Sequence, residues 1–490
     1  MSGFPMDRFR LKRHRFPSQH DYFSMKKILK KIWAWLDDRI GITGLLKPLL
    51  NHKIPPRKLW SYVFGSGTLF CFLLQVITGV SLSLLYQPSS NNAYQSLEFI
   101  TNKAKFGNVL RGIHYFGASG MIILVGVHMM RVYITASYKF PREMNWISGV
   151  FLLLLTIFMG FTGQLLRWDS NGVWSSVVAA EQLGRIPLVG KYMARLLIGG
   201  DTIGGQSLSR FYSYHVFIIP ALMFTFIGLH LYLVLRNGIS EPPKAGRLVD
   251  PATYRQWYKI FLKEKGVPFW PNAVIGDVLF SSVIIMIILG LAFIFGAPAL
   301  TGPPDPSMVH TSPHPDWYML PFFALFALMP KRIESIAMML GPVLTVVGLL
   351  AIPFLSNKGE RSPLKRPWSM FGVIIVLVFV TSLLVLGLKA PWSPKFESKA
   401  LPLAVIKNSN GDTSVAHGAN LFYVKGCQYC HTMHDYGGKA GPNLTNVGNR
   451  LSKDELAIRI VNGGGNMPAY GSILNKNELS NLVAFLAAQK

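Results

Sequence analysis

The chain contains 490 residues, of which half are hydrophobic and only 15% are charged. This balance excludes an ordinary soluble enzyme and is typical of a protein embedded in a membrane. The formal net charge of +26 would suit a nucleic-acid-binding protein. The basic residues are nevertheless distributed as in a membrane protein, so we predict no nucleic-acid partner.

The first 59 residues form a basic segment ahead of the first long apolar run, so no cleavable signal peptide is expected. Residues 1–60 contain fourteen Lys and Arg against four acidic residues. The loops at 136–145, 237–273 and 357–367 are also basic, and this asymmetry predicts a cytoplasmic N-terminus. Residues 32–50 mix tryptophan and leucine with charges. They predict an amphipathic helix, either on the inner membrane surface or against a partner protein.

Seven apolar runs are each long enough to cross a bilayer as a helix. They predict an all-α fold, a polytopic membrane helical bundle. Starting from a cytoplasmic N-terminus, an odd number of spans leaves the C-terminus on the outer face. The predicted spans are residues 61–86, 111–135, 146–166, 213–236, 274–296, 336–356 and 368–388.

Two of these runs each carry a pair of histidines. His114 and His128 are fourteen residues apart in the second run, and His215 and His230 are fifteen apart in the fourth. On an α-helix both separations return the side chains to about one face, roughly 21–23 Å apart along the axis. Two such helices would hold two stacked cofactors, and the cofactor that takes two axial imidazoles is haem. We therefore predict two non-covalent b haems, with hydrogen-bonded interhelical contacts as the alternative.

Glycines in two other spans repeat the same interval. Gly65 and Gly79 in the first span are fourteen residues apart, as are Gly149 and Gly163 in the third. Glycine lets a flat macrocycle approach the backbone closely. The alternative is that these glycines serve ordinary helix crossings.

Arginines accompany the histidines of the second span. Arg111 precedes His114 by three residues and Arg131 follows His128 by three, so each arginine shares its histidine's face. Each is a candidate partner of haem propionates, and snorkelling toward the membrane interface is the alternative. The second and fourth spans both run inward. His114 and His215 should therefore lie near the outer face, and His128 and His230 near the inner face.

A second cofactor signal lies near the C-terminus, where Cys427-Gln-Tyr-Cys430-His431 has the C-x-x-C-H pattern of covalent c-type haem attachment. Zinc and redox sites also use C-x-x-C, but the chain has no second cysteine pair to complete a zinc site. His431 would be the proximal ligand and Met467 the sixth, because Met433 is too close in sequence to reach the opposite face. We predict one covalent haem c, in a domain that ends in an amphipathic helix at 476–488.

Six motifs stand out along the apolar part of the chain: C-F-L-L-Q-V-I-T-G at 71–79, R-x-x-H at 111–114, H-x-x-R-V-Y at 128–133, R-F-Y-S-Y-H at 210–215, P-F-W-P-N at 268–272 and P-D-W-Y at 315–318. Together they resemble the cytochrome b family of quinol–cytochrome c reductases, in its chloroplast-like and Gram-positive version. The resemblance covers roughly residues 35–390, and residues 413–490 resemble a class I cytochrome c. Gram-positive menaquinol–cytochrome c reductases fuse such a domain to the quinol-site half.

These pieces set the predicted domain boundaries. Composition changes abruptly after the seventh span, where a Pro-, Ser- and Asn-rich joint predicts a linker. The predicted units are a basic cytoplasmic N-terminus (1–59), a four-helix dihaem domain (60–240), a three-helix quinol-site domain (241–390), the linker (391–412) and the cytochrome c domain (413–490).

The resemblance implies quinol oxidation at the outer face of a bacterial cytoplasmic membrane, quinone reduction near the inner face and coupled proton translocation. Asp316 would accept the quinol proton, with Tyr318 beside it and Tyr133 as a further candidate for that site. Aspartate in this motif is typical of relatives that use menaquinol. Helix capping is the structural alternative for Asp316. His310 and His314 of the same loop are either exposed residues or proton carriers.

The resemblance also implies partners. A Rieske iron–sulfur protein must be a separate chain, because only Cys71 remains outside the haem motif and a Rieske cluster needs two cysteines and two histidines. A homodimer is implied, as is a terminal oxidase or another acceptor of cytochrome c electrons. Val63 stands where chloroplast-type relatives carry a cysteine that tethers an extra haem, so no such haem is expected. Cys71 is interpreted as a buried apolar residue.

Two other functional classes fit the sequence less well. A passive cytochrome anchor would hand quinol electrons to a partner enzyme, but such anchors lack a P-D-W-Y loop and the spans around it. A purely structural membrane scaffold would not account for the C-x-x-C-H motif.

Overall fold

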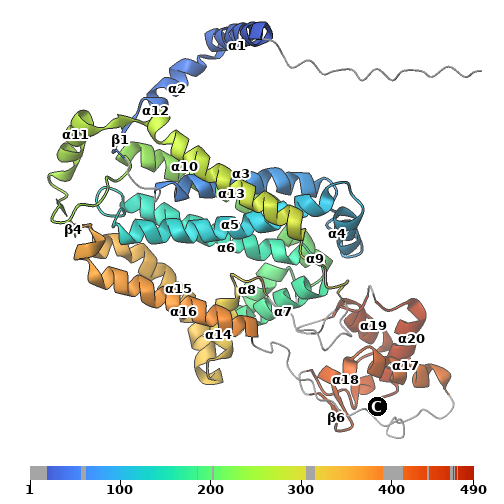
Figure 1. Ribbon diagram of the computed structural model, residues 1–490. Coiled ribbons are helices and arrows are strands. Elements are labelled where there is room, and N and C mark those ends of the chain that lie inside the picture. The colour runs from blue at the N-terminus through green and yellow to red at the C-terminus, as the bar shows by residue number, and fades with distance from the viewer. Residues whose placement is uncertain are drawn as a thin grey trace, which may run out of the picture.

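The computed structural model describes residues 19–56, 62–184, 186–200, 203–304, 315–389, 412–438, 441–463, 467, 469–471 and 473–490. Figure 1 shows a bundle of long helices and, toward the C-terminus, a small domain of short helices. In the described part of the chain every strand is two residues long and pairs with one other strand. The predicted all-α class is confirmed.

Seven helices are long and apolar enough to cross a membrane, as predicted. The fourth span, Gly205–Asn237, is built from α9 (Gly205–Ser213), the π-helical turn η2 (Tyr214–Ile218) and α10 (Ile219–Asn237). It starts earlier than predicted because its first turns are polar and so fall outside the apolar run. The other six spans are α3 (Phe64–Ser83), α5 (Gly107–Ile134), α6 (Glu143–Leu165), α13 (Val274–Phe295), α15 (Lys331–Leu355) and α16 (Pro367–Lys389).

The centre of the bundle is apolar. Helix α3 packs along α5, α5 along α13, and α6 along α10. Cys71 and Phe72 of α3, Met121 of α5 and Met223 of α10 are buried together between these helices. Cys71 is fully buried, which agrees with its interpretation as a core residue.

The bundle has two ends, named here for the histidine of α5 nearest each. Gly163 near the end of α6 packs against His215, and Gly149 near its start packs against His230. The His114 end therefore holds the starts of α5 and α9 and the end of α6. The His128 end holds the ends of α5 and α10 and the start of α6.

Several short helices lie between the spans and were not predicted. At the His114 end, α4 packs on α5 and α8 packs on α9, and α14 packs on α16. These segments are too short, or their apolar residues too irregularly spaced, to show a helical period in the sequence. They are α4 (Ala93–Asn102), α7 (Ser170–Gly184), α8 (Gly190–Ile198), α11 (Tyr254–Lys265), α12 (Phe269–Asn272) and α14 (Leu320–Ala327).

The predicted surface helix at 32–50 is two helices. Helix α1 spans Gln19–Ile40 and α2 spans Ile42–Leu50. Gly41 between them has a φ of +68°, a left-handed conformation that glycine adopts without strain and that ends a helix. In Figure 1, α1 projects away from the bundle. Ile28, Leu29 and Trp35 of α1 each remain half exposed or more.

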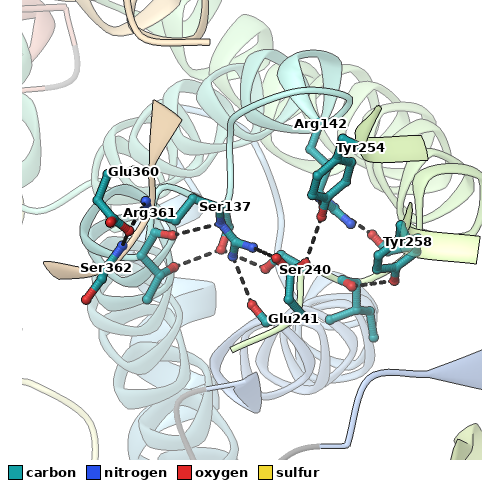
Figure 2. Close-up of polar contacts among 12 residues, drawn as sticks. Ser137, Arg142, Ser240, Glu241, Tyr254, Tyr258, Glu360, Arg361 and Ser362 are labelled. Atoms are coloured by element: carbon teal, nitrogen blue, oxygen red, sulfur yellow. Dashed lines mark hydrogen bonds and ion pairs between the residues drawn. The ribbon is translucent and has the colours of Figure 1, made fainter. Parts of the chain in front are cut away.

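Buried polar contacts join the loops at the His128 end (Figure 2). We call the residues Ser137, Glu241, Tyr254 and Arg361 together the loop clasp. Arg361 pairs with the Glu241 carboxylate and donates to its backbone oxygen at 2.9 Å, while the Tyr254 hydroxyl donates to the same carboxylate at 2.7 Å. The Ser137 hydroxyl lies 2.8 Å from that of Ser240. Two strand pairs reinforce these loops: β1 (Lys53–Ile54) with β3 (Val267–Pro268), and β2 (Leu248–Val249) with β4 (Gly359–Glu360).

The C-terminal domain has its own core. Helix α17 crosses α20 so closely that a Cβ on Gly418 would lie 2.1 Å from the backbone oxygen of Asn481, and Phe422 meets Phe485 beneath the crossing. Both α19 and α20 begin with a capping box. The elements are α17 (Thr413–Val424), α18 (Cys427–Cys430), β5 (Thr432–Met433), β6 (Tyr436–Gly437), η5 (Val447–Asn449), α19 (Lys453–Asn462) and α20 (Lys476–Ala487). The predicted linker lies outside the described residues except for Asp412.

Candidate functional site

The structure brings the predicted histidine pairs together. The ring centres of His114 on α5 and His215 on η2 are 6.3 Å apart, and those of His128 on α5 and His230 on α10 are 6.5 Å apart. Metal–imidazole bonds of about 2.0–2.1 Å on each side, plus the distance from each nitrogen to its ring centre, account for a separation of this size. Each pair is therefore spaced to hold one metal between two imidazoles.

Hydroxyl groups orient three of these imidazoles, and sequence analysis missed them. Thr78 Oγ1 donates to the backbone oxygen of Leu74 at 2.7 Å and lies 2.9 Å from His114 Nδ1. Because the hydroxyl proton is already used, Thr78 accepts the Nδ1 hydrogen. The Nε2 lone pair of His114 is then free for a metal. The same arrangement occurs between Ser148 and His230 at 2.9 Å and between Thr162 and His215 at 3.1 Å.

The four glycines predicted to clear a macrocycle each face one of the four imidazoles. A Cβ at Gly65 would lie 3.0 Å from the His128 ring, and at Gly79 it would lie 3.2 Å from the His114 ring. A Cβ added to any of the four glycines would thus meet the imidazole ring of a predicted haem-ligating histidine first among the described residues. The hydroxyl residues could have been found in the sequence, because each directly precedes one of these glycines: Thr78-Gly79, Ser148-Gly149 and Thr162-Gly163.

The tightest of these contacts gives a testable difference. A Cβ at Gly163 would lie 2.8 Å from His215 Cε1, whereas at Gly149 it would lie 3.6 Å from His230 Cε1, an ordinary van der Waals contact. We expect Gly163→Ala to displace His215 and lower the b haem content, and Gly149→Ala to retain it. The ratio of haem b to haem c in purified protein measures this. Equal haem content in the two variants would contradict the argument.

A cavity of about 590 Å³ surrounds the His128–His230 pair. Gly65, Gly149 and the predicted propionate partner Arg131 also line it. The Arg131 guanidinium lies 3.8 Å above the ring of Tyr62. Apolar walls, two facing imidazoles and a cation at the rim fit a haem with anionic propionates.

The His114 end also fits such a group. Gln75 Nε2 is buried and has no hydrogen-bond partner among the described residues. Because a buried amide without a partner is costly, a polar group on a bound cofactor would satisfy it. Arg111 is buried as well, but its guanidinium donates to Thr101 Oγ1 at 3.0 Å and to the backbone oxygen of Pro298 at 2.7 Å. Propionate binding by Arg111 stays a prediction.

The predicted quinol-site carboxylate lies at the His114 end, against α6. The Asp316 amide donates to Gln164 Oε1 at 3.3 Å, and the Tyr318 hydroxyl donates to Asp316 Oδ2 at 3.2 Å. Tyr318 packs on Gly160 so closely that a Cβ there would lie 2.7 Å from its hydroxyl. Trp317 donates to Ser119 Oγ of α5 at 3.2 Å. The P-D-W-Y segment is thus fixed to α5 and to α6.

Burial raises the pKa of the Asp316 carboxyl above its ordinary value. The nearby positive charge of Arg167 and the hydrogen bond from Tyr318 oppose this rise. A carboxylate with a raised pKa is a better proton acceptor than one exposed to water. His310 and His314 of the same loop lie outside the described residues.

Tyr133 does not join this site, which corrects the sequence-based placement. Its ring stacks on Tyr138 and lies 6.4 Å from Trp146 at the start of α6. Asp316 bonds instead to Gln164 at the end of α6, and eighteen residues of helix separate these two positions, about 27 Å. Tyr133 follows His128 on α5 and therefore belongs to the His128 end.

The C-x-x-C-H residues form a short helix that ends at His431, and one nitrogen of the His431 imidazole remains available to a metal. His431 Nδ1 donates to the backbone oxygen of Pro442 at 2.8 Å, which leaves Nε2 free for a metal. A Cβ at Gly441 would lie 2.6 Å from His431 Cε1, so this close packing needs glycine. Cys427 and Cys430 are not joined in a disulfide. Met467 packs against the domain core beside Tyr470.

Three family models match the chain. The model described as Cytochrome b/b6/petB matches residues 50–238, and that described as Cytochrome b(C-terminal)/b6/petD matches residues 303–401. The model described as Cytochrome C oxidase, cbb3-type, subunit III matches residues 413–486.

Individual proteins are similar as well. Cytochrome b6 of Heliobacterium modesticaldum is 40% identical over 210 residues, which are 42% of this chain and 99% of that protein. The menaquinol:cytochrome c reductase cytochrome b subunit of Bacillus subtilis is 35% identical over 223 residues, or 44% and 100%. A chain of a solved structure titled hyperthermophilic respiratory Complex III superposes with a TM-score of 0.62 at 26% identity, covering 73% of this chain and 91% of that one.

Proposed function

This chain belongs to the cytochrome b family, and from that premise we propose that it is the combined cytochrome b and cytochrome c subunit of a proton-translocating menaquinol–cytochrome c reductase. The observation that carries the proposal is the pair of histidine couples facing each other across α5 and the η2–α10 helix. Menaquinol is supported by the named activity of the Bacillus subtilis relative and by aspartate at position 316.

The residues fit three haems. His114 with His215, and His128 with His230, would each hold a b haem, with Arg131 at the rim of the second site. Cys427, Cys430, His431 and Met467 would hold a c haem. Bound haem would supply one-electron chemistry: the b haems would take one electron of quinol across the membrane, and the c haem would receive the other from a separate Rieske iron–sulfur protein.

Quinol would be oxidised beside Asp316. The carboxylate accepts a proton from the quinol hydroxyl, so an O–H bond of quinol breaks as an O–H bond to Asp316 forms. Gln164 accepts from the Asp316 backbone amide and Tyr318 donates to the Asp316 carboxylate, and Trp317 anchors the segment on α5. Quinone would be reduced at the opposite end, beside the cavity around His128 and His230.

The distribution of charge supports an orientation in a bacterial cytoplasmic membrane. The basic loops after α5, α10 and α15 all lie at the His128 end, which the positive-inside rule assigns to the cytoplasm. Asp316 and the cytochrome c domain would then lie outside, where protons are released. Further partners would be a second copy of this chain and a terminal oxidase or other electron acceptor.

Haem content tests the proposal. We expect about two b haems for each c haem by pyridine haemochrome spectra, because two histidine couples and one C-x-x-C-H motif are present. A haem-stained denaturing gel should show the c haem on a band at the full chain mass. A b:c ratio near one, or a c haem absent from that band, would contradict the proposal.

A further inference from the structure

An ion pair between Arg167 and Asp169 lies near Asp316 at the His114 end. Arg167 follows the end of α6, and its Nη2 pairs with Asp169 Oδ2 and donates to the backbone oxygen of Ala299 at 3.1 Å. Its backbone amide also bonds to the backbone oxygen of Gln164 at 3.3 Å. Gln164 is the residue whose side chain holds the Asp316 amide. Arg167 is therefore one helical turn from the anchor of the proposed proton acceptor.

Asp169 fixes the arginine in position. Its side chain is fully buried, while that of Arg167 is 17% exposed. Asp169 Oδ1 accepts from the Gly172 amide at 2.8 Å, and Oδ2 accepts from the Thr301 amide at 3.1 Å. A carboxylate held by two backbone amides and an ion pair is rigid. The guanidinium it holds is fixed as well.

One nitrogen of the Arg167 guanidinium group makes no hydrogen bond within the described part of the chain. This nitrogen, Nε, is buried. The printed partners of the guanidinium, Asp169 and Ala299, both bond to Nη2, in a setting where burial makes electrostatic effects stronger than in water. The other charged and titratable groups facing Asp316 in the described part of the chain are Tyr318, Asp169 and Tyr115 of α5.

We propose that Arg167 is a positioning residue of quinol oxidation: its charge, clamped by Asp169, keeps the Asp316 carboxylate ionised and able to accept the quinol proton. The inference rests on the proposed role of Asp316. Among the groups near Asp316, Arg167 gives the largest effect that lowers the pKa of the carboxyl, and Asp169 gives a smaller opposite effect. Arg167 acts through Asp316 and does not itself exchange a proton.

The sign of the effect follows from the charge. Removing the cation raises the pKa of Asp316, so the carboxyl stays protonated, and unable to accept a proton, up to a higher pH. In Arg167→Gln the acidic limb of the pH profile should move to higher pH by about one pH unit, the low end of the range for a nearby opposite charge. At a fixed pH on that limb, quinol oxidation should be about tenfold slower.

The experiment follows reduction of the c haem by a menaquinol analogue against pH in the purified complex. Arg167→Lys keeps the charge and should keep the limb where it is. Arg167→Gln leaves Asp169 buried without its partner, which could destabilise the chain. Arg167→Gln/Asp169→Asn removes both charges, and its limb should move in the same direction but less. Haem spectra of each variant establish that the sites are intact.

Asp316→Asn separates failure of this inference from failure of the proposed function. If Asp316→Asn oxidises quinol normally, the proposed base is wrong. If Asp316→Asn is slow but the acidic limb of Arg167→Gln does not move, only the role of Arg167 is overturned. If the acidic limb moves as far in Arg167→Lys as in Arg167→Gln, the cause is structural and not the charge of Arg167. This result would also overturn the proposal.

Discussion

His230→Leu is expected to fold with one b haem instead of two. Leucine fills the apolar space of the imidazole without introducing a polar group, but it cannot ligate iron. His128 would then face a side chain that completes no coordination. The b:c haem ratio should fall from about two to about one, because each b haem needs an imidazole from each side. Transfer of electrons to quinone at the His128 end should be lost.

His215→Leu is the matched variant, because it removes the equivalent ligand of the other couple. It should give the same haem ratio but remove the haem beside Asp316, so quinol oxidation itself should stop. His417→Leu, at an exposed position on α17, should leave all haems and their spectra unchanged. Low-temperature spectra distinguish the two b haems. A pair of single variants that lose the same haem would refute the pairing.

Asp316→Asn is expected to keep all haems and to oxidise quinol about 10²–10⁴-fold more slowly, the usual contribution of a general base. The amide is the same size and can still accept from Tyr318, but it cannot take up a proton. Because burial raises the pKa of Asp316, the acidic limb of the wild-type pH profile should lie above the ordinary aspartate pKa. This limb should be absent in the variant.

Tyr318→Phe provides the comparison for this variant. It removes one hydrogen bond to the carboxylate but leaves the base, so its rate should fall much less than that of Asp316→Asn. The measurement is the rate of c haem reduction by quinol in the purified complex. Unchanged turnover in Asp316→Asn would mean that another group takes the proton, such as His310 or His314 of the same loop.

The spans and the histidine couples could be predicted from the sequence because each depends on one helix at a time. Apolar length gives the span, and the fourteen- and fifteen-residue intervals follow from the helical period. The direction of each span then decides which histidines face each other. The ring separations of 6.3 and 6.5 Å depend in addition on how α5 packs beside η2 and α10, which the pattern of a single helix does not give.

Other features need more than the period of one helix. Family resemblance alone assigns Tyr133 to the site of Asp316, whereas its position on α5, five residues past His128, places it at the other end. The pairs Thr78-Gly79 and Thr162-Gly163 mark hydroxyls beside the predicted glycines. The sequence does not show that they accept from an imidazole, because hydroxyl residues in membrane helices usually bond to their own backbone. These two do so as well, and the packing of another helix adds the imidazole.

The loop clasp has a consequence for how the protein is made. The Cytochrome b/b6/petB model matches residues 50–238 and the Cytochrome b(C-terminal)/b6/petD model matches residues 303–401. Glu241 lies three residues beyond the first stretch, and Arg361, 120 residues later, pairs with it from within the second. Both side chains are buried, so removing either would leave the other charge without its partner. The two matched stretches are therefore held together by this contact as well as by the chain between them. A single chain also fixes the stoichiometry: each translated polypeptide contains one copy of each stretch and one C-terminal domain.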